Sequence, residues 1–499
     1  MSRHPVLVIG AGPTGLVLAL SLARRGIPVR IVDRAGGPGL ASRAMVVQAR
    51  TLEFYRQLGF AEAVVAAGVP MAAIHLREDG EEVARVSFAA MGAGISPYPF
   101  ALCYPQDDHE RFLVDRLAEA GVAVEWGVEL RSFAQDAVGV RAVLGGPDGA
   151  EEQCEAAWLC GCDGAHSRVR QGLGLDFPGG TYEQLFFVAD AEVEGGFRRD
   201  FFLHLGAHAF VLMLPVRSRG VQRLIGIVPE ALGGREGIGF EDLRAPVEAL
   251  LGVRVARVNW FSTYRVHHRV AARFRVGRVF IAGDAGHIHS PAGGQGMNTG
   301  IGDAVNLGWK LAEVVRGRAA EAILETYGSE RIGFARSLVE TTDRAFRGMV
   351  SPGRAGQFLR RWLLPHVVPL LAGLGVARRA MFATVSQVRI HYPDSALSEG
   401  AAGGIEAGDR LPWLAGADNF AGFASLGWRL QLHGEAPELA GAAAALGLAV
   451  DARPWSAAAG EAGFAEGAGY LVRPDLHVGW AGRDAAGLRG YVSRWGVGG

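Results

Sequence analysis

The chain has 499 residues, with 50 basic and 51 acidic side chains and a formal net charge of −1. A chain of this length predicts about three domains with ample buried cores. Because the charges balance and no long run of like charge occurs, the sequence argues against a nucleic-acid-binding protein, which should carry a basic stripe. Hydrophobic residues make up 49% and charged residues 20% of the chain, which is ordinary for an enzyme of this size.

Two residue types are used unusually. Glycine occurs 72 times, and of the 50 basic residues only Lys310 is a lysine, the other 49 being arginines. A single lysine leaves almost no candidate for Schiff-base chemistry, and the pattern is typical of a GC-rich genome. The four cysteines, Cys103, Cys154, Cys160 and Cys162, all lie in the first third of the chain. They predict small buried residues of a cytoplasmic protein rather than a disulfide framework or a metal site.

The sequence predicts neither export nor a membrane partner. Its first apolar stretch, residues 6–9, is too short for a signal peptide and is typical of a strand. The most apolar later segment, residues 362–376, holds two prolines within about 15 residues, where a spanning helix needs about 20. We expect a buried, kinked helix there. We also expect a monomer or homodimer whose partner is a small molecule.

The pattern of residue types divides the chain into three kinds of segment. Residues 1–175 and 270–395 alternate apolar runs with glycine turns, which is typical of α/β units. Residues 176–269 contain short runs rich in β-branched and aromatic side chains and predict an inserted sheet domain, to which residues 70–100 contribute. Residues 396–499 are rich in alanine, glycine and proline and predict a third domain.

The strongest chemical signal lies at the start of the chain. The strand at residues 6–9 runs into a glycine-rich turn that opens an amphipathic helix, and the next strand ends at Asp33. This order of strand, turn, helix, strand and acid predicts a dinucleotide site rather than a simple glycine turn. Gly12 lets the backbone approach a pyrophosphate, and the helix N-terminus attracts phosphate groups. The residues predicted to form the site are Gly10, Gly12, Pro13, Thr14, Gly15, Asp33 and Arg34.

Two further turns follow apolar strands. Asp163 and Gly164 come directly after the first of these strands, with arginines just beyond; alone, Asp163 would be a turn aspartate. Gly283 and Asp284 end the second, and residues 290–300 then lead into another helix. Together with the glycine fingerprint, these motifs resemble the class A flavoprotein monooxygenases, the aromatic hydroxylases related to p-hydroxybenzoate hydroxylase and phenol hydroxylase. Further matches are residues 42–44, 104–111 and 469–475.

The resemblance implies an α/β fold with a Rossmann-like FAD-binding domain of the glutathione-reductase type. It also implies an inserted β-sheet substrate domain and a C-terminal thioredoxin-like domain. No cysteine follows Cys162, so the C-terminal domain should be structural or oligomeric. NADPH or NADH and O2 would be co-substrates, and a flavin C4a-hydroperoxide would transfer one oxygen to an aromatic or phenolic substrate such as a polyketide. Baeyer-Villiger or another oxidation, and a non-catalytic FAD-binding partner, remain alternatives.

The resemblance also assigns roles to residues. Asp33 would bind the adenosine ribose, the backbone of Leu130 would meet the adenine, and Asp284 would bind a ribityl hydroxyl. Because residues 296–298 start a helix, their N–H groups can face the flavin N1/O2 edge. Tyr264 is the candidate for a substrate hydrogen bond, the alternative being a packed strand tyrosine. His204 and His208 are weaker acid–base candidates, and His287 and His289 are expected to support the loop. The remaining cofactor positions are Arg43, Gln106, Asp163, Pro291, Gly294, Gly296, Met297 and Asn298.

Overall fold

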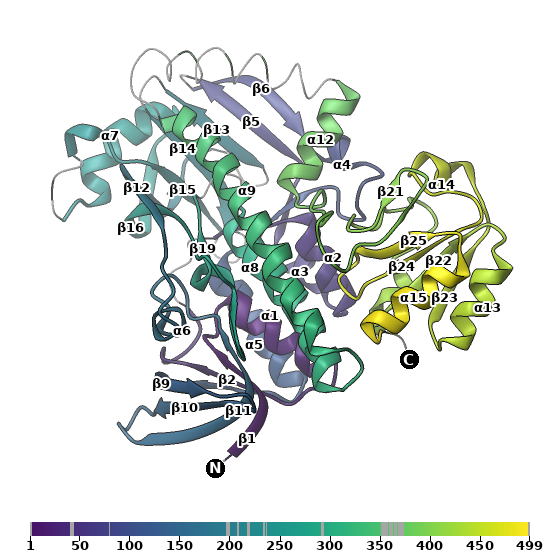
Figure 1. Ribbon diagram of the computed structural model, residues 1–499. Helices are drawn as coiled ribbons and strands as arrows, with labels where there is room; N and C mark the ends of the chain where they lie inside the picture. The colour runs from purple at the N-terminus through teal and green to yellow at the C-terminus, as the bar shows by residue number, and fades with distance from the viewer. Residues whose placement is uncertain are drawn as a thin grey trace.

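Figure 1 shows the computed structural model of the chain. It describes residues 2–39, 44–78, 80–195, 200–206, 209–216, 220–232, 235, 237–290, 294–350, 358, 363, 367 and 374–497. Within these ranges the three largest sheets hold eight, eight and four strands. The chain forms an α/β fold.

The first sheet is centred on β1 (Ser2–Ile9), which pairs in parallel with β2 (Val29–Asp33) on one side and β11 (Glu151–Gly161) on the other. Residues Val6 to Ile9 are all buried, as expected for a strand covered on both faces. The strand order is β17 (Arg275–Val276), β18 (Val279–Ile281), β11, β1, β2 and β8 (Val124–Trp126), while β10 (Val140–Gly145) and β9 (Glu129–Gln135) extend from β11. Helix α1 (Pro13–Ala23) leads from β1 to β2 and packs against α5 (Gln106–Glu119) and α8 (Gly296–Val315).

The second sheet is largely antiparallel. One of its faces packs on α7 (Phe240–Leu251), with Phe187, Met213 and Leu224 in the shared core. The long helix α9 (Glu325–Val350) contacts β16 and runs past the sheet toward α8 (Figure 1). The strand order is β19 (His287–Ile288), β16 (Val255–Val270), β12 (Gly179–Val193), β15 (Val221–Ile227), β14 (Phe210–Val216), β13 (Phe201–Leu205), β5 (Ala73–Glu78) and β6 (Glu81–Ser87).

The third sheet forms a separate C-terminal unit, drawn in yellow-green in Figure 1. Its order is β23 (Ala449–Arg453), β22 (Arg429–His433), β24 (Ala468–Val472) and β25 (Val478–Gly482). The pair β22–β23 is parallel and the other two pairs are antiparallel. Its helices are α13 (Pro437–Ala445), α14 (Ala457–Glu461) and α15 (Ala485–Trp495). We call residues 396–497 the C-terminal unit.

Smaller elements join these sheets. A short sheet holds β3 (Val46–Val47), β7 (Ala101–Cys103) and β4 (Val69–Met71), and the remaining α-helices with described bounds are α2 (Ala49–Gln57), α3 (Ala61–Ala67), α4 (Phe88–Gly92), α6 (Arg168–Gly172) and α12 (Gly375–Val385). Most of residues 362–376 lie outside the described residues. At the end of that segment the expectation of burial is wrong, because Leu374 and Val376 are 56% and 87% exposed. No helix in the described ranges is long and apolar enough to span a bilayer.

Candidate flavin site

The glycine turn after β1 is closely packed at Gly10 and Gly15 and open at Gly12. Gly10 has a φ of +102°, and a Cβ there would lie 2.4 Å from the carbonyl oxygen of Cys162. A Cβ on Gly15 would lie 1.9 Å from the carbonyl oxygen of Gly10, so the helix can sit on the strand only without a side chain. Around Gly12, by contrast, a Cβ would meet nothing within 4 Å. The turn therefore leaves room at Gly12 for an incoming group, as a pyrophosphate requires.

The N-terminus of helix α1 lies next to the open space at Gly12. Pro13 is its first residue, and its first intrahelical bond runs from Leu16 N to Gly12 O, 3.0 Å long. The N–H groups of Thr14 and Gly15 therefore have no acceptor within the helix, which makes this end suited to an anion. The cradle fits the phosphates of a dinucleotide such as FAD.

Asp33 stands at the end of β2, beside the turn. Its carboxylate accepts hydrogen bonds from Ala11 N at 2.7 Å and Ala35 N at 2.8 Å. Each oxygen keeps further lone pairs for a ribose hydroxyl. Arg34 is exposed beside it. Leu130 is buried in β9, two residues beyond Val128, whose N–H donates to Asp33 O at 3.0 Å.

The first turn of α5 braces the segment that contains Arg43. Gln106 Nε2 donates to Glu110 Oε1 at 2.8 Å, and Glu110 Oε2 accepts from Gly39 N at 2.9 Å. Ala44 O accepts from Gln106 N at 3.0 Å. Burial raises the pKa of Glu110. The two ends of the segment are thus fixed to one helix, while Arg43 itself lies outside the described residues.

Asp163 ties its own turn together. Its carboxylate accepts from Ser167 Oγ at 2.5 Å and from Val169 N at 3.2 Å, and burial raises its pKa. Arg170, one of the arginines beyond it, is buried and donates to Ala285 O at 2.9 Å, which joins this turn to the next loop. The side chains of the Asp-Gly motif therefore serve the architecture of the site.

The Gly283–Asp284 loop lies against α1 and α8. Gly283 has a φ of +62°, and a Cβ there would lie 2.5 Å from Thr14 Oγ1; a Cβ on Gly300 would lie 2.3 Å from the same atom. Thr14 thus fills the junction between the nucleotide turn, this loop and the start of α8. Asp284 is exposed at its edge. Three motifs far apart in the sequence meet here.

Asp303 on α8 fixes this loop and was not predicted from the sequence. Its Oδ2 accepts from Gly283 N at 3.0 Å and lies 2.6 Å from His287 Nε2, while Oδ1 accepts from Arg331 Nε at 2.6 Å. Although burial alone would raise it, the charge of Arg331 holds the pKa of Asp303 below its usual value. An acid inside an apolar helical stretch is the only sequence signal for this role.

The start of α8 carries backbone N–H groups that have no partner within the helix. Its first intrahelical bond runs from Thr299 N to Gln295 O, so the N–H groups of Gly296, Met297 and Asn298 have no acceptor within the helix. The side chain of Asn298 is buried and donates to Val46 O and Gly294 O, both at 2.8 Å. Asn298 thus anchors the helix by its side chain. Gly294 has a φ of +63°, and Pro291 lies outside the described residues.

The second sheet turns one face toward this site. Tyr264 on β16 is half-buried, lies opposite Phe186 of β12 with ring centroids 5.9 Å apart, and packs against the main core. His204 lies with Phe202 in β13, beside the core shared with α7, and burial lowers its pKa to about 4. It therefore faces away from Tyr264. His208 lies outside the described residues.

A buried ion pair on the Tyr264 face escaped the sequence reasoning. Arg223 Nε and Nη2 donate to the two oxygens of Asp190 at 2.7 and 2.8 Å, and the guanidinium carbon lies 5.6 Å from the ring of Trp260. The only signal for this pair is an arginine within an apolar strand.

His289 lies in the loop that leads to α8. Its Nδ1 lies 2.8 Å from Ser290 O, and burial lowers its pKa to about 4.

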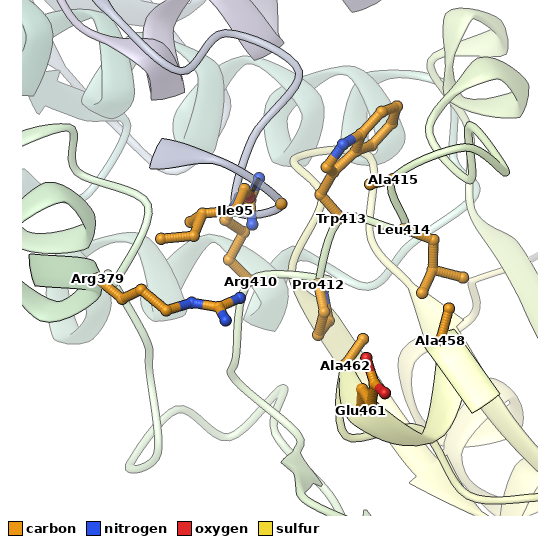
Figure 2. A pocket seen from close by; sticks show the side chains of 11 residues that line it. Ile95, Arg379, Arg410, Pro412, Trp413, Leu414, Ala415, Ala458, Glu461 and Ala462 are labelled. Atoms are coloured by element: carbon orange, nitrogen blue, oxygen red, sulfur yellow. Dashed lines mark hydrogen bonds between the residues drawn. The ribbon is translucent and has the colours of Figure 1, made fainter. Parts of the chain in front are cut away.

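A cavity that contains none of these residues lies elsewhere. It has a volume of about 410 Å³ and opens between α12, the loop at Ile95 and the C-terminal unit. Figure 2 shows the side chains of Arg379 and Arg410 on one side of it and Glu461 and Trp413 on the others. No residue predicted from the motifs lines it.

A nucleotide turn, a Gly-Asp loop and a helix start that meet at Thr14 define a dinucleotide-binding protein of the α/β class. A family model described as FAD binding domain matches residues 3–342. The chain is 40% identical over 413 residues to 6-methylpretetramide 4-monooxygenase of Streptomyces rimosus, which covers 80% of this chain and 72% of that protein. It is 33% identical over 422 residues to pentachlorophenol 4-monooxygenase of Sphingobium chlorophenolicum, covering 82% and 75%.

Solved structures agree. The flavin-dependent monooxygenase PieE in complex with FAD and substrate superposes with a TM-score of 0.81 at 25% identity, covering 99% of this chain and 98% of that chain. The chain belongs to the family of class A FAD-dependent aromatic hydroxylases, and the resemblance inferred from its motifs is confirmed. It is an FAD-dependent monooxygenase.

Proposed function

We propose that this protein hydroxylates an aromatic or phenolic substrate, of the polyketide type, with NADPH or NADH and O2 as co-substrates. The meeting of three flavin motifs at Thr14 supports the proposal most strongly, because it is built from segments near residues 14, 283 and 300. The 6-methylpretetramide named as the substrate of the Streptomyces rimosus relative supports the choice of a polyketide. Bound FAD would supply hydride acceptance and oxygen transfer.

The chain's own residues would bind and orient the cofactor. The N-terminus of α1 and the open space at Gly12 would take the pyrophosphate, and Asp33 the ribose. Asp284 would accept a hydrogen bond from a ribityl hydroxyl. The first N–H groups of α8 would stabilise the negative charge at the flavin N1/O2 edge. The other proposed cofactor residues are Gly10, Pro13, Thr14, Gly15, Arg34, Arg43, Gln106, Leu130, Asp163, Pro291, Gly294, Gly296, Met297 and Asn298.

The substrate would lie between the second sheet and the start of α8. Tyr264 would hydrogen-bond the substrate hydroxyl from the sheet face that also carries Phe186. The aromatic and apolar character of that face would exclude water and favour a large ring system. The pair Asp190–Arg223 would set the polarity beneath it.

The domain assignment follows from the same reasoning. Residues 1–175 and 270–395 would be the FAD-binding domain and residues 176–269 the substrate domain, joined by β5 and β6. Residues 396–499 would be thioredoxin-like, because a parallel βαβ unit followed by two antiparallel strands gives the order β23-β22-β24-β25. We propose a cytoplasmic monomer or homodimer; four free, buried cysteines agree with a reducing compartment.

The test is a product assay on the purified protein. NADPH and NADH oxidation is measured with simple phenols and with tetracyclic aromatic polyketides, and products are weighed by mass spectrometry. A product heavier by one oxygen supports the proposal. Oxidation of the nicotinamide without any oxygenated product overturns hydroxylation, and a ring-expanded ester identifies a Baeyer-Villiger enzyme. Protein that binds FAD yet oxidises no nicotinamide with any aromatic identifies a non-catalytic partner.

The cofactor assignment has its own test. Asp284→Ala should weaken FAD retention, whereas Asp115→Ala, at an exposed aspartate of α5, should not. Equal retention by both variants overturns the role of Asp284.

A further inference from the structure

The only lysine of the chain lies in a wholly buried charge cluster. Lys310 Nζ lies 2.7 Å from Glu330 Oε2 of α9 and donates to Asn306 Oδ1 at 2.8 Å. Neither Lys310 nor Glu330 exposes its side chain to solvent. Burial lowers the pKa of Lys310 to about 8. Buried charges persist only where close partners compensate for lost hydration, so each bond in this cluster fixes a geometry.

The C-terminal unit completes the cluster. Arg473, at the end of β24, donates to both oxygens of Glu330 at 2.8 and 2.9 Å and to Asp475 Oδ2 at 2.7 Å. Asp475 Oδ2 also accepts from the indole N–H of Trp309 on α8 at 2.9 Å. Although burial alone would raise it, the charge of Arg473 holds the pKa of Asp475 well below its usual value. The turn between β24 and β25 is thus tied to both α8 and α9.

From α9 the contacts continue to the Gly283–Asp284 loop. Arg331, next to Glu330, donates to Asp303 Oδ1 at 2.6 Å and to Thr299 O at 3.0 Å. Asp303 in turn accepts from Gly283 N. Two neighbouring residues of α9 therefore hold α8: Arg331 near its start, beside the proposed flavin site, and Glu330 farther along the helix.

A second series of contacts starts at His477, the residue immediately before β25. Its ring packs on Tyr392 with centroids 4.6 Å apart, and the Tyr392 hydroxyl accepts from Arg331 Nη1 at 2.9 Å. The C-terminal unit has its own apolar core, which contains Leu411, Phe423 and Tyr470. Arg473 and His477 reach beyond this unit, to Glu330 of α9 and to Tyr392.

We propose that Arg473 and Asp475 are positioning residues that set α8 and the Gly283–Asp284 loop for FAD. The C-terminal unit thereby determines the affinity for FAD through the contacts of Arg473 and Asp475 with α8 and α9, which we call the junction. The inference rests on the proposed flavin site, and it gives the chain's single lysine a task as the α8 member of the junction.

The first experiment measures the dissociation constant for FAD of the full chain after the flavin has been removed. Asp475→Asn removes the charge but keeps the shape, and it should weaken FAD binding about tenfold. Tyr470→Phe is the control, because Tyr470 lies in β24 of the same unit, in that unit's own apolar core, and the change removes its hydrogen bonds with Ala402 O and Ala465 N. A folded Asp475→Asn protein that binds FAD as tightly as the control overturns the inference.

The second experiment needs no flavin. Hydrogen exchange of peptides covering residues 283–303 should speed up in flavin-free Asp475→Asn and stay unchanged in Tyr470→Phe. If Asp475→Asn does not fold, Arg473→Lys, which keeps the positive charge but not the planar guanidinium, replaces it. Arg473→Lys should recover part of the FAD affinity lost in Arg473→Gln. Unchanged exchange in every junction variant overturns the inference, whereas wild-type protein that fails to bind FAD overturns the proposed function instead.

Discussion

Two single-methyl changes in the nucleotide turn separate the fold from the cofactor site. Gly12→Ala places a Cβ where nothing lies within 4 Å, and Gly12 has a φ of −72°, which alanine readily adopts. Gly15→Ala places a Cβ 1.9 Å from Gly10 O, although real Cβ contacts essentially never fall below 3.0 Å. The first change fills space intended for a ligand, and the second fills space the backbone already uses.

The expected magnitudes follow from these distances. At Gly12, loss of a tolerated N-cap residue costs about 0.5–1 kcal/mol, and reduced freedom of the unfolded chain returns about as much. The stability of flavin-free protein should therefore stay unchanged. At Gly15, backbone must move by at least 1.1 Å, the difference between 3.0 and 1.9 Å, so the overpacking should cost about 1–3 kcal/mol.

The assay pairs urea unfolding of flavin-free protein with FAD titration. Gly12→Ala should unfold at the wild-type urea concentration yet bind FAD more than about tenfold more weakly, because the methyl group meets the pyrophosphate. Gly15→Ala should unfold earlier even without FAD. Wild-type affinity in Gly12→Ala would refute the placement of the pyrophosphate over this residue.

Three further outcomes are expected. Burial lowers the pKa of His109 to about 3, so its stabilising neutral form is fully present above about pH 6.5 and is lost as the pH falls from there toward 3. Urea unfolding at pH 7.5 and 5.0 should show wild type losing about 2 kcal/mol more than His109→Gln, and equal losses would contradict this. Tyr264→Phe should lower the yield of product per NADPH oxidised, whereas Thr263→Val, at the adjacent position on the other face of β16, should not; equal yields would remove Tyr264 from the site. Lys310→Arg should destabilise the protein by about 3 kcal/mol in urea unfolding, and wild-type stability would show that the pocket accepts a larger cation.

Local rules made the nucleotide turn predictable. Gly10 takes a positive φ, Pro13 begins α1, and Asp33 ends β2, all within the one strand–helix–strand unit of residues 2–33. Three predicted strands of the second sheet also appear as β12, β14 and β15. In contrast, β16 was not recognised as a long strand, because its buried and exposed positions do not alternate regularly and charged residues interrupt it.

Contacts between distant segments could not be predicted. The role of Asp303 in holding Gly283 could not be predicted because its partner Arg331 lies on another helix. Asp190 and Arg223 come together only when β12 and β15 pair. Nothing in the local pattern around any of these residues specifies the other. Asn298 shows the opposite case: its position at the helix start was predicted, but its side chain anchors β3.

The use of lysine at one position and arginine at 49 others has a physical side. Arg473 spreads its planar guanidinium over two carboxylates, Glu330 and Asp475, a geometry that arginine alone matches. Within the part of the chain that the structure describes, Lys310 donates to two acceptors, Asn306 and Glu330, and its side chain has no exposed surface. A guanidinium there would bring five N–H donors and greater length, leaving donors buried without partners beside a second arginine. The small, closed site on α8 therefore explains why lysine stands at this one position of a chain that otherwise uses arginine.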